Sequence, residues 1–136
     1  MASNPNDTWV ALKTALMTVS VAEIIDRITI LRIKLGRPNQ FDPVQVKIQI
    51  QRHADELSRL SLHAGTDDLV RVLERVNRIL WRLENEIRCC IAKGQFGSRF
   101  VCVARMIVRL NERRAFIKSE IDELNKSGFR DTKSYL

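Results

Sequence analysis

The sequence contains little glycine, proline or cysteine, and each shortage excludes a class of protein. Five Gly and three Pro among 136 residues are too few for a collagen-like or low-complexity chain, and 45% hydrophobic residues exclude a disordered one. Cys89, Cys90 and Cys102 are an odd number without Cys-x-x-Cys spacing. They are therefore predicted to be reduced residues of the core or its boundary, not a disulfide framework or a zinc site. At this length the prediction is one domain with its own hydrophobic core.

Long apolar runs are also missing, and the first residues do not resemble an export signal. Every apolar stretch is interrupted by Arg, Glu or Asp well before the roughly 18 residues that a membrane span needs. Residues 1–7 contain neither a basic segment nor an apolar one. We therefore expect no transmembrane helix and a cytoplasmic location.

Start and stop signals divide the chain into four helices. Ser20 and Glu23 form a capping box that predicts a first helix over residues 21–35, ended by Gly36 in a left-handed cap conformation. Asp42 and Pro43 begin a second, more polar helix that is expected to run to residues 64–65. Its predicted apolar face consists of Val44, Ile48, His53 or Ala54, Leu57, Leu60 and Leu62.

Two longer helices follow, and each carries an apolar seam with alternating spacings of three and four residues. Residues 66–68 are predicted to cap the third helix, which ends at residues 93–94, and the fourth runs from residue 97 or 98 to residues 127–128. The seams are Leu69, Leu73, Val76, Leu80, Leu83 and Ile87 in the third helix, and Phe100, Val103, Ile107, Leu110, Arg114, Ile117, Ile121 and Leu124 in the fourth.

These elements predict an all-α fold, an antiparallel bundle of about four helices in which the two long C-terminal helices form a hairpin. We divide the chain into an N-terminal segment, residues 1–19, that is a short helix or extended, the helical bundle of residues 20–128, and a tail of residues 129–136.

Several polar residues interrupt the apolar faces. Asp26 and Arg32 fall among the isoleucines and valine of the first helix, and Arg114 lies in the seam of the fourth. We expect solvent to be scarce at Arg32, Arg88 and Arg114. Two polar ribbons could face each other, one formed by Asn77, Trp81, Glu84 and Arg88 and the other by Asn111, Arg114 and Lys118.

The two ribbons have a structural and a functional interpretation. In the first, Asp26 and Glu84 neutralise Arg114 and Arg88, and the network fixes the register of the helices. In the second, the same groups line a small cleft for an anionic ligand, because guanidinium groups suit carboxylate and phosphate.

Positive charge is in excess, with 23 Lys and Arg against 16 Asp and Glu and a net charge of +7. This balance favours anionic partners without specifying one. Arg71, Arg75, Arg78 and Arg82 recur at helical spacing and would be the phosphate contacts of a nucleic-acid-binding protein. Acidic residues are interleaved and no aromatic stacking platform accompanies the stripe, so we rank nucleic acid last among the partners.

Catalytic signatures are few. His53 and His63 lie about three turns apart along one helix, too far to share a metal, and no Gly-rich phosphate loop or Gly-x-Ser-x-Gly motif occurs. We predict no metal and no cofactor. Asp26 or Glu84 would be the acid–base group if the protein were an enzyme, which the sequence leaves undecided.

Several strings resemble a family of small, uncharacterised bacterial all-helical proteins. They include residues 20–31, residues 76–88, residues 111–115 and the terminal Lys133-Ser134-Tyr135, and the likeness spans about residues 19–135. Members of that family are often associated with glycosyltransferase or surface-polysaccharide genes, and no activity is established for them. The resemblance implies a bacterial source and a glycan context. Arg32 departs from the family pattern, which tends to have an acidic residue there.

The leading hypothesis is a small cytoplasmic helical-bundle binding or accessory protein, whose partner is another protein or a second copy of the chain. The second is a small enzyme or ligand-binding protein that holds an anionic or sugar-related metabolite in an Arg-lined cleft. Its candidate residues are Asp26, Asn77, Trp81, Glu84, Arg88, Asn111, Arg114 and Lys118. The third hypothesis is nucleic-acid binding through the arginine stripe of the third helix.

Overall fold

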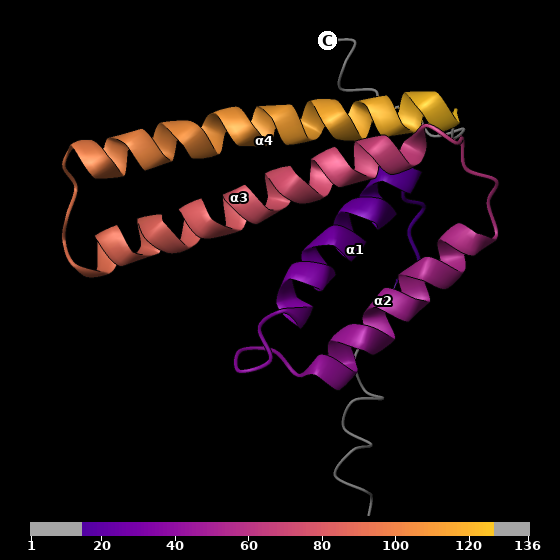
Figure 1. The fold of residues 1–136 in the computed structure, drawn as a ribbon, viewed down its shortest axis with the longest axis horizontal. Coiled ribbons are helices and arrows are strands. Elements are labelled where there is room, and N and C mark those ends of the chain that lie inside the picture. The colour runs from indigo at the N-terminus through magenta and orange to yellow at the C-terminus, as the bar shows by residue number, and fades with distance from the viewer. Residues whose placement is uncertain (1–14, 127–136) are drawn as a thin grey trace, which may run out of the picture.

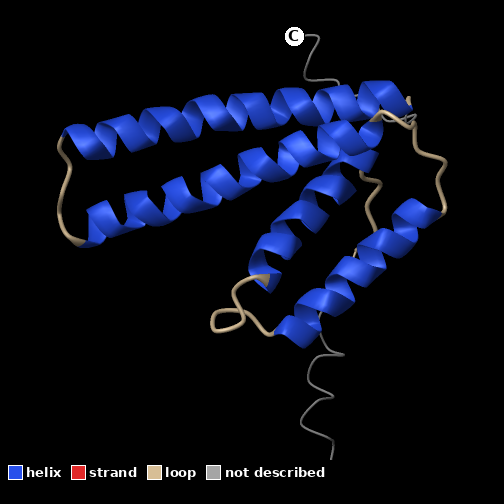
Figure 2. Ribbon diagram, viewed as in Figure 1, coloured by secondary structure: helices blue, strands red, loops and turns tan. Residues whose placement is uncertain are grey.

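The computed structural model describes residues 15–126, which form four α-helices and no strand within that range. The helices are α1 (Val21–Leu35), α2 (Pro43–Ser58), α3 (Thr66–Ala92) and α4 (Ser98–Asn125). Figure 1 shows α3 and α4 as a long antiparallel hairpin, with α1 and α2 forming a shorter hairpin that packs beside one half of it. The helical content, which Figure 2 shows by colour, confirms the all-α prediction and the C-terminal hairpin.

Helix α1 begins and ends at the predicted residues, but its C-terminal cap differs from the prediction. At the start, Ser20 Oγ accepts a hydrogen bond from the Glu23 N–H at 3.3 Å, which is half of the capping box. At the end, Gly36 has φ −72° and is not left-handed. Its N–H donates to the carbonyls of Arg32 and Ile33, so the chain leaves the helix through a tightened last turn.

Helix α2 is shorter than predicted, and it buries different side chains from those expected. It ends at Ser58, whose hydroxyl donates to the carbonyl of Asp55 at 2.6 Å, rather than at residues 64–65. Val44 and Ile48, two residues of the predicted face, are 62% and 41% exposed, whereas Val46 is buried. The predicted face was wrong for Val44 and Ile48, whereas Leu57, which also belongs to it, packs against the core. Among the described helices α2 contacts only α1, so its buried stripe is narrower than the pattern of apolar residues suggests.

The two long helices confirm the predicted seams. Leu73, Val76, Leu80 and Leu83 of α3 are buried, as are Val103, Ile117 and Ile121 of α4. The cap of α3 differs from the prediction, because Gly65 is the N-cap and no side chain caps it. Thr66 is the first helical residue and shares a hydrogen bond with Asn125 of α4 instead. Gly94, with φ +65°, makes the turn between α3 and α4.

The core lies where α1 meets the α3–α4 hairpin. Val21, Ala22 and Ile25 of α1 pack against Leu73, Val76 and Leu80 of α3 and against Ile117 and Ile121 of α4. Burying each of the Val, Ile and Leu side chains in this core contributes about 1.5–3 kcal/mol to folding. The half of the hairpin near the turn extends beyond α1 and α2, so its two helices depend largely on each other there (Figure 1).

The cysteines and the helix ends complete the comparison with the sequence. The three cysteines are unpaired, and only Cys90 is buried, so the expectation of core positions was wrong for Cys89 and Cys102. Helix α4 ends at Asn125, slightly before the predicted residues 127–128. Residues 15–20 are not helical, and residues 1–14 and the predicted tail lie outside the described residues. Within the described range, none of the helices has the length and apolarity that crossing a bilayer requires.

Candidate functional site

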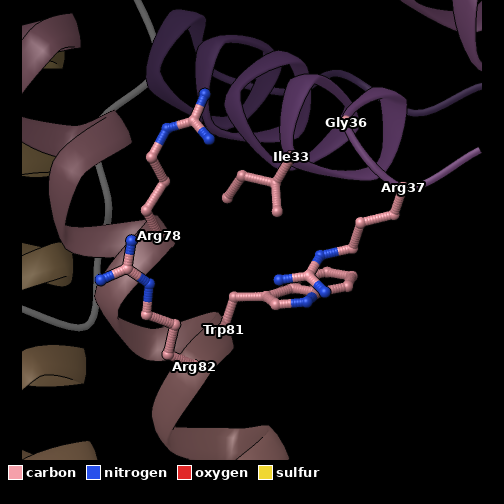
Figure 3. A pocket seen from close by; sticks show the side chains of 6 residues that line it. All are labelled: Ile33, Gly36, Arg37, Arg78, Trp81 and Arg82. Carbon is pink, nitrogen blue, oxygen red and sulfur yellow. The ribbon is translucent and has the colours of Figure 1, made fainter.

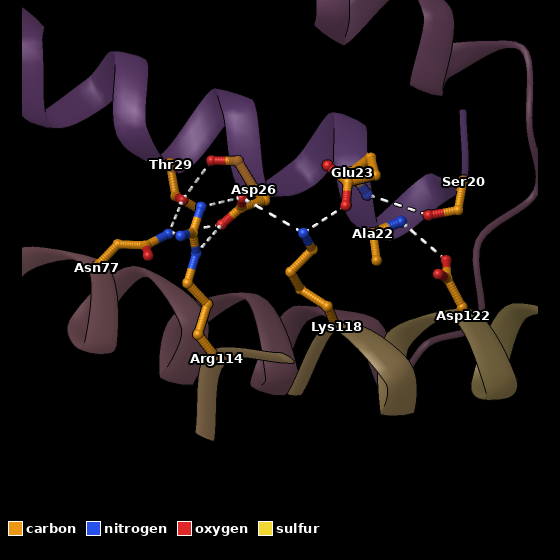
Figure 4. Close-up of polar contacts among 9 residues, drawn as sticks. All are labelled: Ser20, Ala22, Glu23, Asp26, Thr29, Asn77, Arg114, Lys118 and Asp122. Carbon is orange, nitrogen blue, oxygen red and sulfur yellow. Dashed lines mark hydrogen bonds and ion pairs between the residues drawn. The ribbon is translucent and has the colours of Figure 1, made fainter. Parts of the chain in front are cut away.

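Asp26 is the buried carboxylate around which α1, α3 and α4 meet. It is only 3% exposed, because α1 carries apolar residues around most of its surface and Asp26 lies on the side that faces the hairpin. Its Oδ1 atom accepts hydrogen bonds from Asn77 Nδ2 at 2.9 Å and from Arg114 Nε at 3.1 Å, and its Oδ2 atom accepts one from Arg114 Nη2. The Asp26–Arg114 contact is therefore bidentate, the strongest geometry for this pair (Figure 4).

Thr29 and Asn77 satisfy the remaining polar atoms near the carboxylate. Asn77 Nδ2 donates its second hydrogen to Thr29 Oγ1 at 2.7 Å, and the Thr29 hydroxyl donates to the backbone carbonyl of Asp26 at 2.8 Å. Both side chains are buried. A buried amide and a buried hydroxyl cost free energy unless they are paired, so this chain of hydrogen bonds makes their burial tolerable.

Lys118 and Asp122, one turn apart on α4, extend the contact toward the start of α1. Lys118 Nζ pairs with Glu23 and lies 3.8 Å from Asp26 Oδ2. Asp122 Oδ1 accepts a hydrogen bond at 2.9 Å from the backbone N–H of Ala22, one of the amides that a helix N-terminus leaves without a partner. We call Glu23, Asp26, Thr29, Asn77, Arg114, Lys118 and Asp122 the Asp26 network.

Both members of the central pair are charged at neutral pH. Burial alone would raise the pKa of Asp26, but the hydrogen bonds from Arg114 and Asn77, with the charges of Arg114 and Lys118, outweigh it and hold the pKa below its ordinary 3.8. The hydrogen bond to Asp26 in turn raises the pKa of Arg114. The chemical result is a fixed ion pair between α1 and α4.

The structure brings together four of the eight ligand candidates, Asp26, Asn77, Arg114 and Lys118. Glu84 is not in contact with them, although its charge contributes to the raised pKa of Arg114. Arg88 is exposed and donates to Asn85, and Asn111 is exposed on α4. The predicted pairing of Asp26 with Arg114 is confirmed. The predicted pairing of Glu84 with Arg88 is not found among the described residues.

Scarcity of solvent was predicted wrongly for Arg32 and Arg88, which are both exposed. The packing of α1 against α2, α3 and α4 leaves the Arg32 side chain uncovered. Of the three arginines at which solvent was expected to be scarce, Arg114 alone has limited access to water, with 28% of its side chain exposed.

Trp81, the remaining ligand candidate, lies apart from the Asp26 network, near the C-terminal end of α1. The Arg37 guanidinium stacks over its ring at 5.5 Å, and Phe41 meets the ring edge-on at 6.0 Å between centroids. Figure 3 shows this residue at the edge of an open cleft between α1 and α3.

The arginine stripe of α3 is exposed, as a solvated face requires. Arg71 pairs with Asp68, and Arg78 Nη2 lies 3.1 Å from Glu74 Oε1. All four arginines of the stripe, Arg71, Arg75, Arg78 and Arg82, are exposed, and the last two also line the cleft beside Trp81.

Four residues near these sites were not predicted from the sequence, although partial signals for some of them are present. Glu23 was assigned to the capping box, so its pairing with Lys118 was not anticipated, and Asp122 follows Lys118 by one helical turn. Arg37 and Phe41 belong to the loop after α1, where no periodicity indicates which side chains meet. Within the described residues, no group of three or more His, Cys, Asp or Glu is placed to hold a metal ion.

Comparison with known proteins identifies the family but not an activity. A family model described as a family of unknown function, DUF6165, matches residues 15–136, and the chain belongs to this family. Searches of curated proteins and of solved structures give no match. The match confirms that the chain resembles an uncharacterised family over nearly its whole length.

Proposed function

We propose that the protein is a binding module without catalytic chemistry of its own, and that it works as a homodimer assembled through the outer face of α4. The observation that carries the proposal is a row of exposed apolar side chains on that face. Val101, Val108 and Phe116 are 43%, 59% and 61% exposed. The face lies opposite the buried seam of α4, at the edge of the molecule (Figure 1).

The spacing of these residues distinguishes them from scattered surface hydrophobics, which are normal in soluble proteins. Val101, Val108 and Ala115 follow one another at intervals of seven, and Phe116 is adjacent to the last. An interval of seven residues brings side chains back to nearly the same side of a helix and is the repeat by which helices pair. The outer face of α4 thus has the pattern of a second helix–helix contact.

The charges beside this row favour a second copy of the chain as the occupant. Arg105 and Arg109 lie in the first half of the face, whereas Glu112, Glu120 and Glu123 lie in the second half. A two-fold axis perpendicular to α4 makes the two copies antiparallel, so that each basic half lies against the partner's acidic half, whereas an axis along α4 would make them parallel and place like charges together. In this arrangement Arg105 approaches Glu120 of the other copy, and Arg109 approaches Phe116.

The properties of Asp26 support the part of the proposal that assigns the protein no acid–base chemistry. A general base needs a pKa near the working pH and an open path to substrate. Asp26 has a lowered pKa, is 3% exposed and already accepts three side-chain hydrogen bonds. We therefore assign these residues the task of holding α1 against α3 and α4.

The cellular setting is a separate part of the proposal. The three unpaired thiols support a reducing compartment such as the cytoplasm. A bacterial source and a role as accessory to glycan or surface-polysaccharide assembly are supported only by the likeness to small bacterial proteins associated with such genes. Co-purification of the tagged chain with a glycan-assembly enzyme from its source organism supports that role, and its absence there counts against it.

The dimer is tested by the mass of the full chain in solution. Sedimentation equilibrium is expected to give twice the chain mass of 15.7 kDa. Arg105→Glu alone and Glu120→Arg alone are each expected to weaken the dimer, because each places like charges opposite one another. The double variant Arg105→Glu/Glu120→Arg restores both contacts in a two-fold dimer and is expected to recover it.

Arg75→Glu is the matched control, since Arg75 is exposed on α3 and lies off the proposed interface. It is expected to leave the dimer unchanged. A chain that stays monomeric at every concentration contradicts the proposal. Failure of the double variant to recover the dimer contradicts the antiparallel α4 arrangement.

A further inference from the structure

We infer that the cleft between the end of α1 and the middle of α3 is a binding site for a small diphosphate-bearing molecule. The cleft encloses about 350 Å³ and is lined by Ile33, Gly36, Arg37, Arg78, Trp81 and Arg82. This volume lies at the lower end of the range for small-molecule sites. The site belongs to α1 and α3, so the inference does not depend on self-association through α4.

The lining is rich in hydrogen-bond donors that carry positive charge. Arg78 and Arg82 rise from α3 on one side of the cleft, and Arg37 lies over Trp81 on the other, with Ile33 between them (Figure 3). Arg78 pairs with Glu74 at 3.1 Å. Among the described residues, Arg37 and Arg82 have no carboxylate oxygen within the 4 Å of an ion pair. The cleft therefore has a surplus of positive charge.

Trp81 adds a donor that has no partner. Its Nε1 atom is buried, and no hydrogen-bond acceptor reaches it among the described residues. An indole N–H can only donate, and a buried donor without an acceptor is rare in folded proteins. Arg37 stacks over the ring, so a ligand that draws Arg37 aside uncovers the indole, and a ligand oxygen there supplies the missing acceptor.

The number of donors decides between classes of anion. Three guanidinium groups and an indole N–H offer more donors than the two oxygens of one carboxylate can accept. A diphosphate presents several oxygens on two adjacent tetrahedral groups, and arginine pairs with phosphate oxygens in the same bidentate manner as with carboxylate. The space beyond one phosphate group leaves room for the second and for a small substituent.

Trp81 also gives the site an optical readout. Arg37 stacks on the ring at 5.5 Å, so a ligand that attracts Arg37 changes the surroundings of the indole. The chain has two tryptophans, Trp9 and Trp81. Trp9→Phe therefore leaves Trp81 as the single indole whose emission reports binding.

The test is a titration of the full chain with inorganic pyrophosphate at constant ionic strength, followed by calorimetry and by Trp81 emission in the Trp9→Phe background. We expect saturable binding, with orthophosphate and citrate weaker by roughly tenfold or more. Orthophosphate offers fewer oxygens, and citrate spreads its oxygens over three separate planar carboxylates instead of two adjacent tetrahedral groups. Absence of saturable pyrophosphate binding overturns the inference. Equal binding of citrate overturns the assignment to phosphate.

Two substitutions on α3 separate a built site from diffuse charge. Arg82→Gln removes a cleft guanidinium and is expected to weaken pyrophosphate binding by about tenfold or more, whereas Arg75→Gln removes the same charge from the same helix outside the cleft and is expected to change it by less than about twofold. Equal effects of the two variants overturn the inference. Both residues are exposed, so unfolding curves are expected to match that of the parent chain.

Trp81→Phe tests the indole N–H, because it keeps an aromatic ring for Arg37 and Phe41. We expect pyrophosphate binding weaker by roughly threefold to tenfold, and unchanged affinity overturns the role of the indole. A single-stranded oligonucleotide is the last comparison. If it binds more tightly than pyrophosphate and Arg75→Gln weakens it as much as Arg82→Gln does, the arginines serve a nucleic-acid face and the diphosphate site is refuted.

Discussion

Removal of the Arg114 guanidinium is expected to destabilise the fold, because it leaves the buried Asp26 carboxylate without its main partner. Arg114→Met keeps the apolar stem of the side chain and deletes the bidentate contact to Asp26. Breaking one side of a fully buried ion pair costs about 3–5 kcal/mol. Arg114 is 28% exposed, and Asn77 and Lys118 remain near Asp26, so we expect a cost at or below the bottom of that range, about 2–3 kcal/mol.

The assay is urea unfolding followed by circular dichroism at neutral pH, together with thermal unfolding. For a domain of this size, a loss of about 2–3 kcal/mol corresponds to a fall in Tm of roughly 6–15 °C. A double-mutant cycle with Asp26→Asn isolates the pair, and its coupling energy is expected to reach about 1–3 kcal/mol.

Arg78→Met is the matched control for this prediction. It also removes one arginine from an ion pair, but the Arg78 side chain is 52% exposed and Glu74 is its neighbour one turn away on α3. We expect its cost to stay near 0.5 kcal/mol or less, as for other exposed pairs on a helix (roughly 0.3–0.5 kcal/mol). If Arg114→Met costs no more than Arg78→Met, the argument that Asp26 holds α1 in place is refuted.

Three further predictions concern stability. Because the pKa of Asp26 is lower in the folded than in the unfolded chain, its contribution is present above pH 3.8 and declines as the pH falls through the folded-state value. Urea unfolding of Asp26→Asn should therefore depend less on pH in the acid range, and parallel profiles would contradict this. Leu73→Ala should lower the free energy of unfolding in urea by about 2–5 kcal/mol, since Leu73 has no exposed surface. Val72→Ala is the control and should cost about 1 kcal/mol or less, because Val72 is 36% exposed. Equal losses in the two variants would contradict the position of the core. Gly94→Ala should cost roughly 1 kcal/mol in thermal unfolding because φ is +65°, and a neutral Gly94→Ala would contradict the left-handed turn.

Local signals predicted the helices well where sequence and packing agree. The capping box at Ser20 and the seams of the two long helices give the elements and their buried faces, because the period of a helix follows from the backbone alone. The second helix shows the limit of such signals. Its apolar residues occupy more than one side, and only contact with α1 decided that Val46 is buried and Val44 exposed.

The sequence predicts that Asp26 and Arg114 need polar partners, but it identifies only some of those partners. A carboxylate in an apolar stretch of α1 and an arginine in the seam of α4 both indicate a need for partners. The predicted pairing of Asp26 with Arg114 is confirmed. That Asn77 joins this pair while Glu84 and Arg88 do not pair depends on how the helices are rotated against each other, because a rotation of one residue position changes which side chains meet.

The scarcity of glycine, proline and cysteine excluded collagen-like, low-complexity and disulfide-linked chains, and the caps and periodic apolar seams determined that the chain folds as helices. That conclusion needs only local propensity and periodicity. The tertiary structure alone decided that α2 rests on α1, that Asn77 joins the predicted pair of Asp26 with Arg114, and that Arg37 reaches Trp81 to form a cleft. The reason is physical, since contacts between distant residues depend on the rotation and crossing of whole helices, which no single segment of sequence encodes.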